Sequence, residues 1–356
     1  MTIDDRLFEA ARNGAADTLA TLLDEHPDKL YVRDQPYGWS LLHLAAHGGH
    51  LSTVDLLLNR GLDVNIREQG DNTYPMHWAA AAGHLDVVQR LADAGGDVVG
   101  HGDDHELEVI GWASCWNGSD DAIHRAVVDY LVARGARHHI FSAIALSLAD
   151  QVRRIVSADP SALARKMSHN EGYQLPLHFA VRMNRPQMVA LLMELGADPL
   201  ATDGSGYRAA AYATTPDIDR PVMEAIRARG LQDLFTALAL GDWDAAALLL
   251  RDTPDALTAG GASFGTLHLM SKRGNGAAVQ WLLDHGADPN ARWSHWDAEV
   301  TPLHLAVLGA HPEVVRSLLQ AGADPRIRDS MHDSDAIGWA EFFQRFEIVR
   351  IIRASA

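Results

Sequence analysis

Short apolar runs with a shared opening recur along the chain, and the clearest copy lies near its end. There Thr301 and Pro302 precede a run that is apolar through Ala306 apart from His304, and Gly322 follows sixteen residues later. A threonine hydroxyl caps a helix, and proline fits the first helical turn, where no amide donor is needed. Glycine ends a helix because it takes the left-handed cap conformation without steric cost. The pattern predicts two short helices, a pair too small to bury its own apolar face.

The same opening and the same closing glycine occur in several further copies. The openings begin at Ser40, Tyr74, Leu175 and Gly265, and the closing glycines are Gly61, Gly95, Gly196 and Gly286. His43 and His77 are 34 residues apart. These motifs resemble the ankyrin repeat family, whose unit of about 33 residues holds two antiparallel helices and a β-turn finger. The resemblance implies an all-α fold, an ankyrin-repeat solenoid of about ten to eleven helix-turn-helix units with β-turn fingers.

Three copies of an irregular starting unit divide the array. In each, a phenylalanine precedes a proline by 19 residues, at Phe8 and Pro27, Phe141 and Pro160, and Phe235 and Pro254. The first copy predicts helices from about Arg6 to Arg12, capped by Asp4 and Asp5, and from about Ala16 to Glu25. We expect one continuous solenoid in three parts, with a first arm at residues 1–138, an irregular middle group at 139–230 and a second arm at 231–356.

Charge and composition narrow the function classes. The chain carries 30 Lys and Arg against 47 Asp and Glu, a formal net charge of −17. This acidic character argues against nucleic acid and anionic membranes as main partners. The one cysteine, Cys115, excludes an internal disulfide, and no stretch holds the roughly 18 apolar residues of a spanning helix. The first residues lack a basic region followed by an apolar run, the pattern of a signal peptide, and we expect an intracellular, cytoplasmic protein.

The repeated histidines are interpreted as structural rather than as metal ligands. They are His43, His77, His178, His268 and His304. Packed helices place successive repeats about 10 Å apart, whereas a metal needs its ligands at about 2.0–2.3 Å. We therefore expect no metal and no cofactor here. The resemblance implies that each histidine hydrogen-bonds to backbone near its helix start, and that Trp78, Trp112 and Trp339 fill the space between helices.

Two finger segments share a pattern that suggests chemistry. His105 and Glu106 in one arm match His332 and Asp333 in the other, and in both copies Ile-Gly-Trp-Ala begins after three further residues. An acidic residue beside an imidazole can shuttle a proton or bind a divalent cation. The structural alternative is that Glu108 and Asp335 replace the capping threonine, and that the two histidines only brace their fingers.

The resemblance also implies a binding face, made of finger tips and the inner side of each first helix. Side chains just after the motif alanines are expected to project there, together with finger aromatics. The predicted partner-binding residues are His47, Cys115, Trp116, Arg182, Met183, Lys272, Arg273 and Phe342, with Trp296 and Tyr74 from the fingers. Arginine and aromatic side chains are enriched in interface hot spots, and the cations can bind a carboxylate or phosphate.

Two functions remain open from the sequence. The first is a protein–protein interaction module that binds a partner through its concave face, or possesses a site for a small anionic or aromatic ligand. The alternative is a solenoid enzyme or small-molecule binder with a pocket between the arms, using the histidine and acidic fingers, Trp116 and Arg182. No nucleophile elbow, phosphate-binding glycine loop or zinc-protease motif occurs in the sequence. The first function is therefore favoured.

Overall fold

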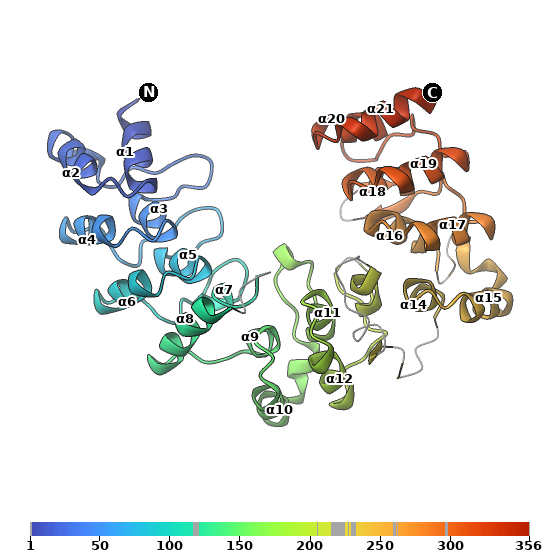
Figure 1. Cartoon of the computed structure of the whole chain (residues 1–356), viewed down its shortest axis with the longest axis horizontal. Coiled ribbons are helices and arrows are strands. Elements are labelled where there is room, and N and C mark those ends of the chain that lie inside the picture. Colours follow the sequence, from blue (N-terminus) through green and yellow to red (C-terminus); the bar gives the residue numbers. More distant parts are fainter. Residues whose placement is uncertain are drawn as a thin grey trace. The chain divides into compact units, whose positions relative to one another are not determined.

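Short helices joined in pairs make up most of the molecule (Figure 1). The computed structural model describes residues 2–116, 121–204, 206–214, 225–226, 228, 233–258, 261, 263–295 and 298–355. The chain divides into two compact units, residues 1–176 and 177–356. The three-part division expected from the sequence stays a prediction.

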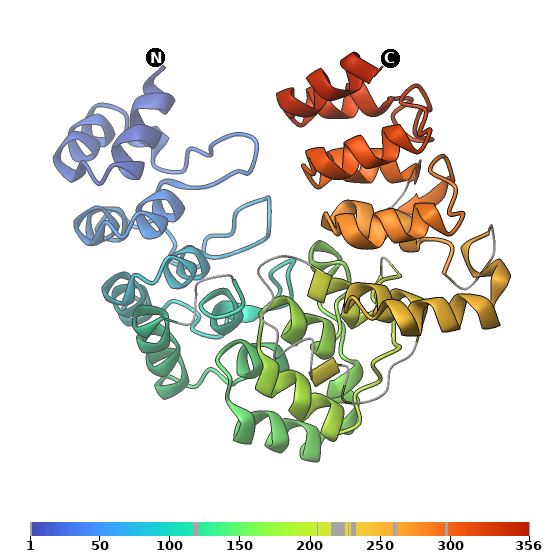
Figure 2. The ribbon, with the colours of Figure 1, turned by 45° about the vertical axis from the view of Figure 1, so that its right-hand side comes forward.

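The described part of the first unit contains five helix pairs. They are α1 (Ile3–Arg12) with α2 (Ala16–Glu25), α3 (Leu41–His47) with α4 (Leu51–Asn59), α5 (Pro75–Ala81) with α6 (Leu85–Asp93), α7 (Glu108–Trp112) with α8 (Ala122–Ala133), and α9 (Ile140–Ala145) with α10 (Ala149–Ala158). The first helices α1, α3, α5, α7 and α9 pack in one row, and α2, α4, α6 and α8 pack in a second row (Figure 1). Long loops, the fingers, project from the row of first helices before α3 and α5 (Figure 2).

The second unit repeats this arrangement. Its pairs are α11 (Pro176–Arg182) with α12 (Pro186–Glu194), α14 (Leu234–Ala239) with α15 (Trp243–Asp252), α16 (Thr266–Arg273) with α17 (Gly276–Asp284), α18 (Pro302–Leu308) with α19 (Pro312–Gln320), and α20 (Ala336–Phe342) with α21 (Phe346–Ser355). The first helices α16, α18 and α20 pack in a row, as do the second helices α17, α19 and α21. The helix η4 (Ala209–Thr214) is of the 3-10 type and packs against α14 and α16. The all-α repeat fold predicted from the sequence is confirmed.

The three irregular starting units share one local structure. After the second helix of each unit, the proline that lies 19 residues beyond the phenylalanine begins a 3-10 helix. These helices are η1 (Pro27–Lys29), η2 (Pro160–Ala164) and η5 (Pro254–Leu257). Proline suits this place because its missing N–H needs no partner at a helix start. The helix α2 has the predicted bounds, but the prediction that Asp4 and Asp5 cap α1 is wrong. Thr2 is the capping residue: its hydroxyl accepts from the Asp5 amide at 3.1 Å, and the Asp5 carboxylate accepts from the Thr2 amide at 2.7 Å.

The fingers contain little regular structure. One short 3-10 helix, η3 (His169–Glu171), lies in the finger before α11. The finger before α18 forms a two-stranded antiparallel ribbon from β1 (Trp293–His295) and β2 (Ala298–Val300), with Trp293 opposite Val300.

The histidine before a second helix ties neighbouring repeats together. The Nε2 of His84 donates to the carbonyl of His47 at 3.0 Å, and that of His50 donates to the carbonyl of Arg12 at 2.9 Å. The imidazole fills the space over a glycine, because a Cβ added to Gly49 would lie 2.7 Å from the His84 ring. No helix among the described residues has the length and apolar character that crossing a membrane requires.

Candidate functional site

The motif histidines position the fingers by bridging one repeat to the next. The amide of Ser40 donates to Nδ1 of His43 at 3.3 Å, so Nε2 carries the proton and donates to the Thr73 carbonyl at 3.1 Å. His77 makes the same pair of bonds, from the Tyr74 amide and to the Gly100 carbonyl. Burial lowers the pKa of His43 to about 3. The structural role expected for these histidines is confirmed.

In the fingers before α7 and α20, one buried carboxylate accepts hydrogen bonds from several backbone amides of the same finger. Asp103 accepts from the amides of His105, Leu107 and Glu108, at 2.9 to 3.2 Å, and from the indole Nε1 of Trp112 at 3.1 Å. In the second unit, Asp329 accepts from the amides of Met331, His332 and Ser334 and from the indole Nε1 of Trp339 at 2.9 Å. The carboxylate thus fixes both the finger and the tryptophan that follows it.

Burial alone would raise the pKa of Asp329, but bonds from the His332 amide, the Trp339 indole and further amides outweigh it and lower the pKa. A related arrangement occurs at Glu68, which accepts from the Thr73 hydroxyl at 2.8 Å, while that hydroxyl accepts from the Trp78 indole at 2.8 Å. The sequence analysis did not identify these three carboxylates as structural residues. Their signal is an acidic residue nine or ten positions before a motif tryptophan.

Four tryptophans form a continuous row in the first unit, which we call the aromatic row: Trp39, Trp78, Trp112 and Trp116. The ring centroids are 4.2 Å apart for Trp39 and Trp78, 5.0 Å for Trp78 and Trp112, and 5.5 Å for Trp112 and Trp116. Trp112 is buried, as expected for a side chain between helices, whereas the other three are half-buried. The row follows the first helices, since Trp39 precedes α3, Trp78 lies in α5, and Trp112 is the last residue of α7.

The exposed ring of His47, at the end of α3, lies beside this row. Its centroid is 5.7 Å from Trp39 and 5.6 Å from Trp78. Desolvation, followed by the charge of His84, lowers the pKa of His47. His47 and Trp116, both predicted from the sequence, therefore belong to one surface.

His105 lies at the other end of the row, between two carboxylates. Its Nδ1 bonds to Oε1 of Glu171, and its Nε2 lies 3.3 Å from Oδ1 of Asp71. Its ring packs edge-on against Trp112 and Trp116, with centroids 5.2 and 5.5 Å away. Desolvation acts to lower the pKa of His105, but the bond and charge of Glu171 and the charge of Asp71 outweigh it and raise the pKa.

The acid–base pairs predicted from the shared finger pattern do not form. His105 uses Asp71 and Glu171 rather than Glu106, which is exposed. His332 lies 3.3 Å from Asp329, while Asp333 accepts from Arg328 at 2.6 Å. With both ring nitrogens bonded to carboxylates, His105 has the geometry of a brace between fingers. Within the described residues, no group of three or more His, Cys, Asp or Glu side chains could hold a metal ion.

The two expected acidic caps differ. Asp335 caps α20, accepting from the Gly338 amide at 2.8 Å. Glu108 does not cap α7, because Leu107 occupies the position before the helix and Glu108 is its first residue, with its amide donating to Asp103 at 2.9 Å. The Glu108 carboxylate pairs instead with Nδ1 of His101 at 3.0 Å.

The remaining predicted residues of the first unit have different environments. Cys115 is wholly buried, with its sulfur 3.7 Å from the Ser114 hydroxyl, so it offers no partner contact here. Tyr74 is half-buried, and the guanidinium of Arg67 lies 4.2 Å from its ring centroid and donates to its hydroxyl at 2.8 Å. The sequence placed both side chains on the binding face, and the structure leaves only Tyr74 accessible.

In the second unit the predicted cations lie over aromatic rings. Arg273 lies 4.4 Å from the Tyr212 ring centroid, and the Lys272 ammonium lies 5.6 Å from that of Tyr207. Arg182 lies 5.0 Å from the ring of Phe179. Desolvation, followed by the charge of Arg273, lowers the pKa of Lys272 to about 8.

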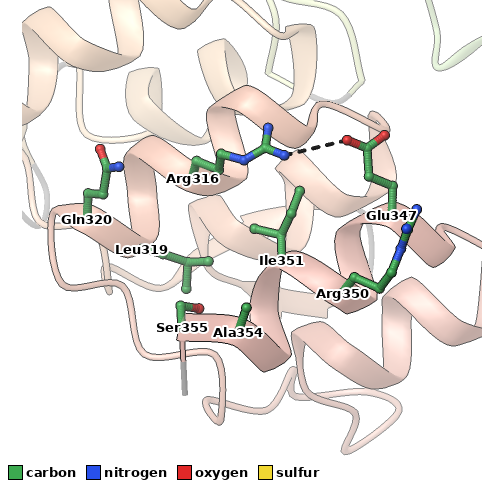
Figure 3. A pocket seen from close by; sticks show the side chains of 8 residues that line it. All are labelled: Arg316, Leu319, Gln320, Glu347, Arg350, Ile351, Ala354 and Ser355. Carbon is green, nitrogen blue, oxygen red and sulfur yellow. Dashed lines mark ion pairs between the residues drawn. The ribbon is translucent and has the colours of Figure 1, made fainter.

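Three further predicted residues complete the second unit. Met183 is buried, which removes it from any surface, and Phe342 is 80% exposed at the end of α20. Trp296 lies outside the described residues. A groove between the second helices α19 and α21 is lined by Arg316, Leu319, Glu347 and Ile351 among others (Figure 3), and none of the predicted residues lines it.

Comparison with known proteins agrees with this architecture. The sequence model described as "Ankyrin repeats (3 copies)" matches residues 7–101 and 222–329, and the model described as "Ankyrin repeat" matches residues 174–204. The chain belongs to the ankyrin repeat family. Ankyrin repeats are protein–protein interaction modules. The two long matches include Trp39 and Trp78 of the aromatic row and the Lys272 region, whereas Trp112 and Trp116 lie outside them.

Two curated relatives resemble parts of the chain. The integrin-linked protein kinase homolog pat-4 of Caenorhabditis elegans is 41% identical over 71 residues, which is 20% of this chain and 15% of the relative. The B-cell lymphoma 3 protein homolog of Mus musculus is 33% identical over 142 residues, which is 35% of this chain and 31% of the relative. The chain thus spans less than a third of the length of either relative.

Among solved structures, the human ASB11 ankyrin repeat domain matches with a TM-score of 0.42 and 22% identity. The match covers 63% of this chain and 96% of that domain.

Proposed function

We propose that this ankyrin repeat protein binds a protein partner on the face formed by its first helices and fingers, with the aromatic row of the first unit as the main contact. The observation that carries the proposal is the chain of ring contacts from Trp39 to Trp116, with three of the four indoles half-buried. Large aromatic side chains in such positions bury much area at low entropic cost and dominate interface energies.

The rigidity of the row supports the same proposal. The indoles of Trp78 and Trp112 are hydrogen-bonded to Thr73 and Asp103, so little side-chain freedom is lost when a partner binds. His47 and Tyr74 extend the surface on α3 and at the start of α5. In the second unit, Arg182, Lys272, Arg273 and the exposed Phe342 are proposed as further partner contacts.

The proposal is tested by quantitative co-purification from extracts of the cells that express the protein. The variants are His47→Glu, which changes an exposed side chain, and Trp116→Ala. A matched control is Val132→Ala, which alters an exposed apolar side chain of α8 in the row of second helices. We expect His47→Glu and Trp116→Ala to fail to co-purify a protein that co-purifies with the wild type and with the control. Equal recovery of every protein by all four forms would contradict the proposal.

A further inference from the structure

The fingers beside the aromatic row carry a strongly unequal charge. The segments 30–40, 63–74 and 97–108 together contain nine Asp and Glu residues but only two arginines. Both arginines are engaged by backbone. Arg33 donates to the carbonyls of Gly38 and Arg67, and Arg67 donates to the carbonyls of His101 and Gly102 among others. The local potential at the row is therefore negative.

The carboxylates differ in what they already bind. Asp103 and Glu68 are buried and are used by amides of their own fingers. Asp104 and Glu106, in contrast, are exposed, and among the described residues neither side chain has a hydrogen-bond or ion-pair partner. These two carboxylates are available to a charged group that arrives from outside.

Asp104 and Glu106 flank His105, the residue that connects their finger to the aromatic row. His105 contacts the rings of both Trp112 and Trp116, and its two nitrogens are bound to Asp71 and Glu171. The Asp104 amide also donates to the Asp71 carbonyl at 2.9 Å, which joins this finger to the preceding one. A positive charge on His105 is compensated by its own two carboxylates, so it does not neutralise Asp104 or Glu106.

Aromatic faces and unpaired carboxylates together select a cation. A guanidinium or ammonium over an indole face is attracted by the ring quadrupole, and a neighbouring carboxylate adds a charged hydrogen bond. A partner with acidic side chains would meet repulsion at the same place. We infer that the segment bound on the aromatic row is basic, and that it places an Arg or Lys side chain over Trp116, where Asp104 and Glu106 pair with it. This inference rests on the proposed function and names the chemistry of the partner.

The test is selection from a random peptide library displayed on phage, with the full-length chain immobilised. We expect the enriched peptides to be rich in Arg and Lys, and their binding to weaken as salt is raised. Synthetic copies of the enriched peptides are then titrated against four forms of the protein by fluorescence anisotropy. The forms are the wild type, Trp116→Ala, the double variant Asp104→Asn with Glu106→Gln, and a control double variant.

The control, Asp86→Asn with Asp129→Asn, removes the same number of exposed charges from α6 and α8, in the row of second helices. The finger double variant should lower peptide affinity about fivefold, and the control should leave it unchanged. Enrichment of neutral or acidic peptides that still require Trp116 would overturn the basic partner while leaving the proposed function standing. Peptides that bind Trp116→Ala as well as wild type, or no enrichment at all, would count against both.

Discussion

His105 and Glu171 are hydrogen-bonded although 66 residues separate them in the sequence. The bond joins the finger before α7 to the finger before α11, and Asp71 on the opposite side of the imidazole joins a third finger. Glu171 is itself oriented by the Ser168 hydroxyl, which donates to it at 2.6 Å. The end of the aromatic row is therefore braced by one ionisable side chain.

The His105 brace predicts a pH dependence of stability. Its pairing raises the folded pKa above the value of about 6.5 in an unfolded chain. The stabilisation is thus complete below that unfolded value and is lost as the pH rises through the folded pKa. We expect His105→Asn to lower the free energy of unfolding by about 2 kcal/mol at mildly acidic pH, and by less at alkaline pH. Denaturant titrations across this range measure the difference.

Subtracting the free energy of unfolding of the variant from that of the wild type isolates the contribution of His105. Other histidines affect stability with the opposite pH dependence. Burial lowers the pKa of His77 and His139 to about 4, so these side chains stabilise the fold only while they stay neutral and lose that contribution in acid. A wild-type minus variant difference that is constant with pH would show that His105 does not act through its charge.

The buried carboxylate Asp329 predicts a large effect from a small change. Asp329→Asn keeps the shape but replaces one acceptor oxygen by a donor. That donor faces the His332 amide if it replaces Oδ1, or the Ser334 amide if it replaces Oδ2. We expect a loss of about 2–4 kcal/mol in the free energy of unfolding, because donors would be buried without partners. Since the folded pKa is lowered, the loss should shrink as the pH falls below that of an unfolded aspartate. Asp333→Asn, in the same finger, should change stability by less than about 1 kcal/mol.

Alanine substitutions at two glycines distinguish the cost of backbone strain from the cost of side-chain crowding. Gly49 and Gly61 both have left-handed φ, +71° and +86°, so alanine at either should cost about 1 kcal/mol. At Gly49 the new Cβ would also lie 2.7 Å from the His84 ring, whereas nothing lies within 4 Å at Gly61. Thermal unfolding should therefore show a clearly lower Tm for Gly49→Ala than for Gly61→Ala. Equal Tm values would mean that the imidazole moves aside freely.

The lowered pKa of Lys272 predicts a visible titration. Desolvation and the neighbouring Arg273 bring it to about 8, so NMR of the side-chain nitrogen should show Lys272 losing its proton near that pH, well before Lys29. The fold disfavours the charged form, and this penalty is present below the folded pKa and fades as the pH rises through it. Lys272→Met should raise stability at neutral pH and lose that advantage in alkaline solution. A titration close to pH 10.5 would refute the burial of this cation.

Local sequence patterns predicted the parts of the fold that local chemistry determines. Proline at the first position of α5 and α18, capping by Asp335, and the bond of the motif histidine to backbone at its own helix start follow from short spacings that recur in several units. The cap of α1 was misassigned because several polar residues near the start could cap, and only Thr2 combines with Asp5 in a capping box.

Contacts between distant fingers were not accessible from the same patterns. The ring of His105 finds its partners Asp71 and Glu171 only after three fingers have packed together. Burial is equally a property of neighbouring repeats. Cys115 and Met183 occupy positions that the pattern places on the binding face, and the packed chain covers both. The position of a residue in the repeat predicts the direction of its side chain from its own helix. It does not predict which residues of neighbouring repeats cover that side chain.

The central claim is that the aromatic row faces a protein partner, and site-specific photo-crosslinking tests it most directly. A photoreactive phenylalanine derivative replaces the exposed His47 beside the row, or the exposed Val132 on α8 as the control. On irradiation in cell extract, we predict a distinct crosslinked protein at position 47, suppressed by excess unmodified chain and absent at position 132. No crosslink specific to position 47, or the same product at both positions, would contradict the claim.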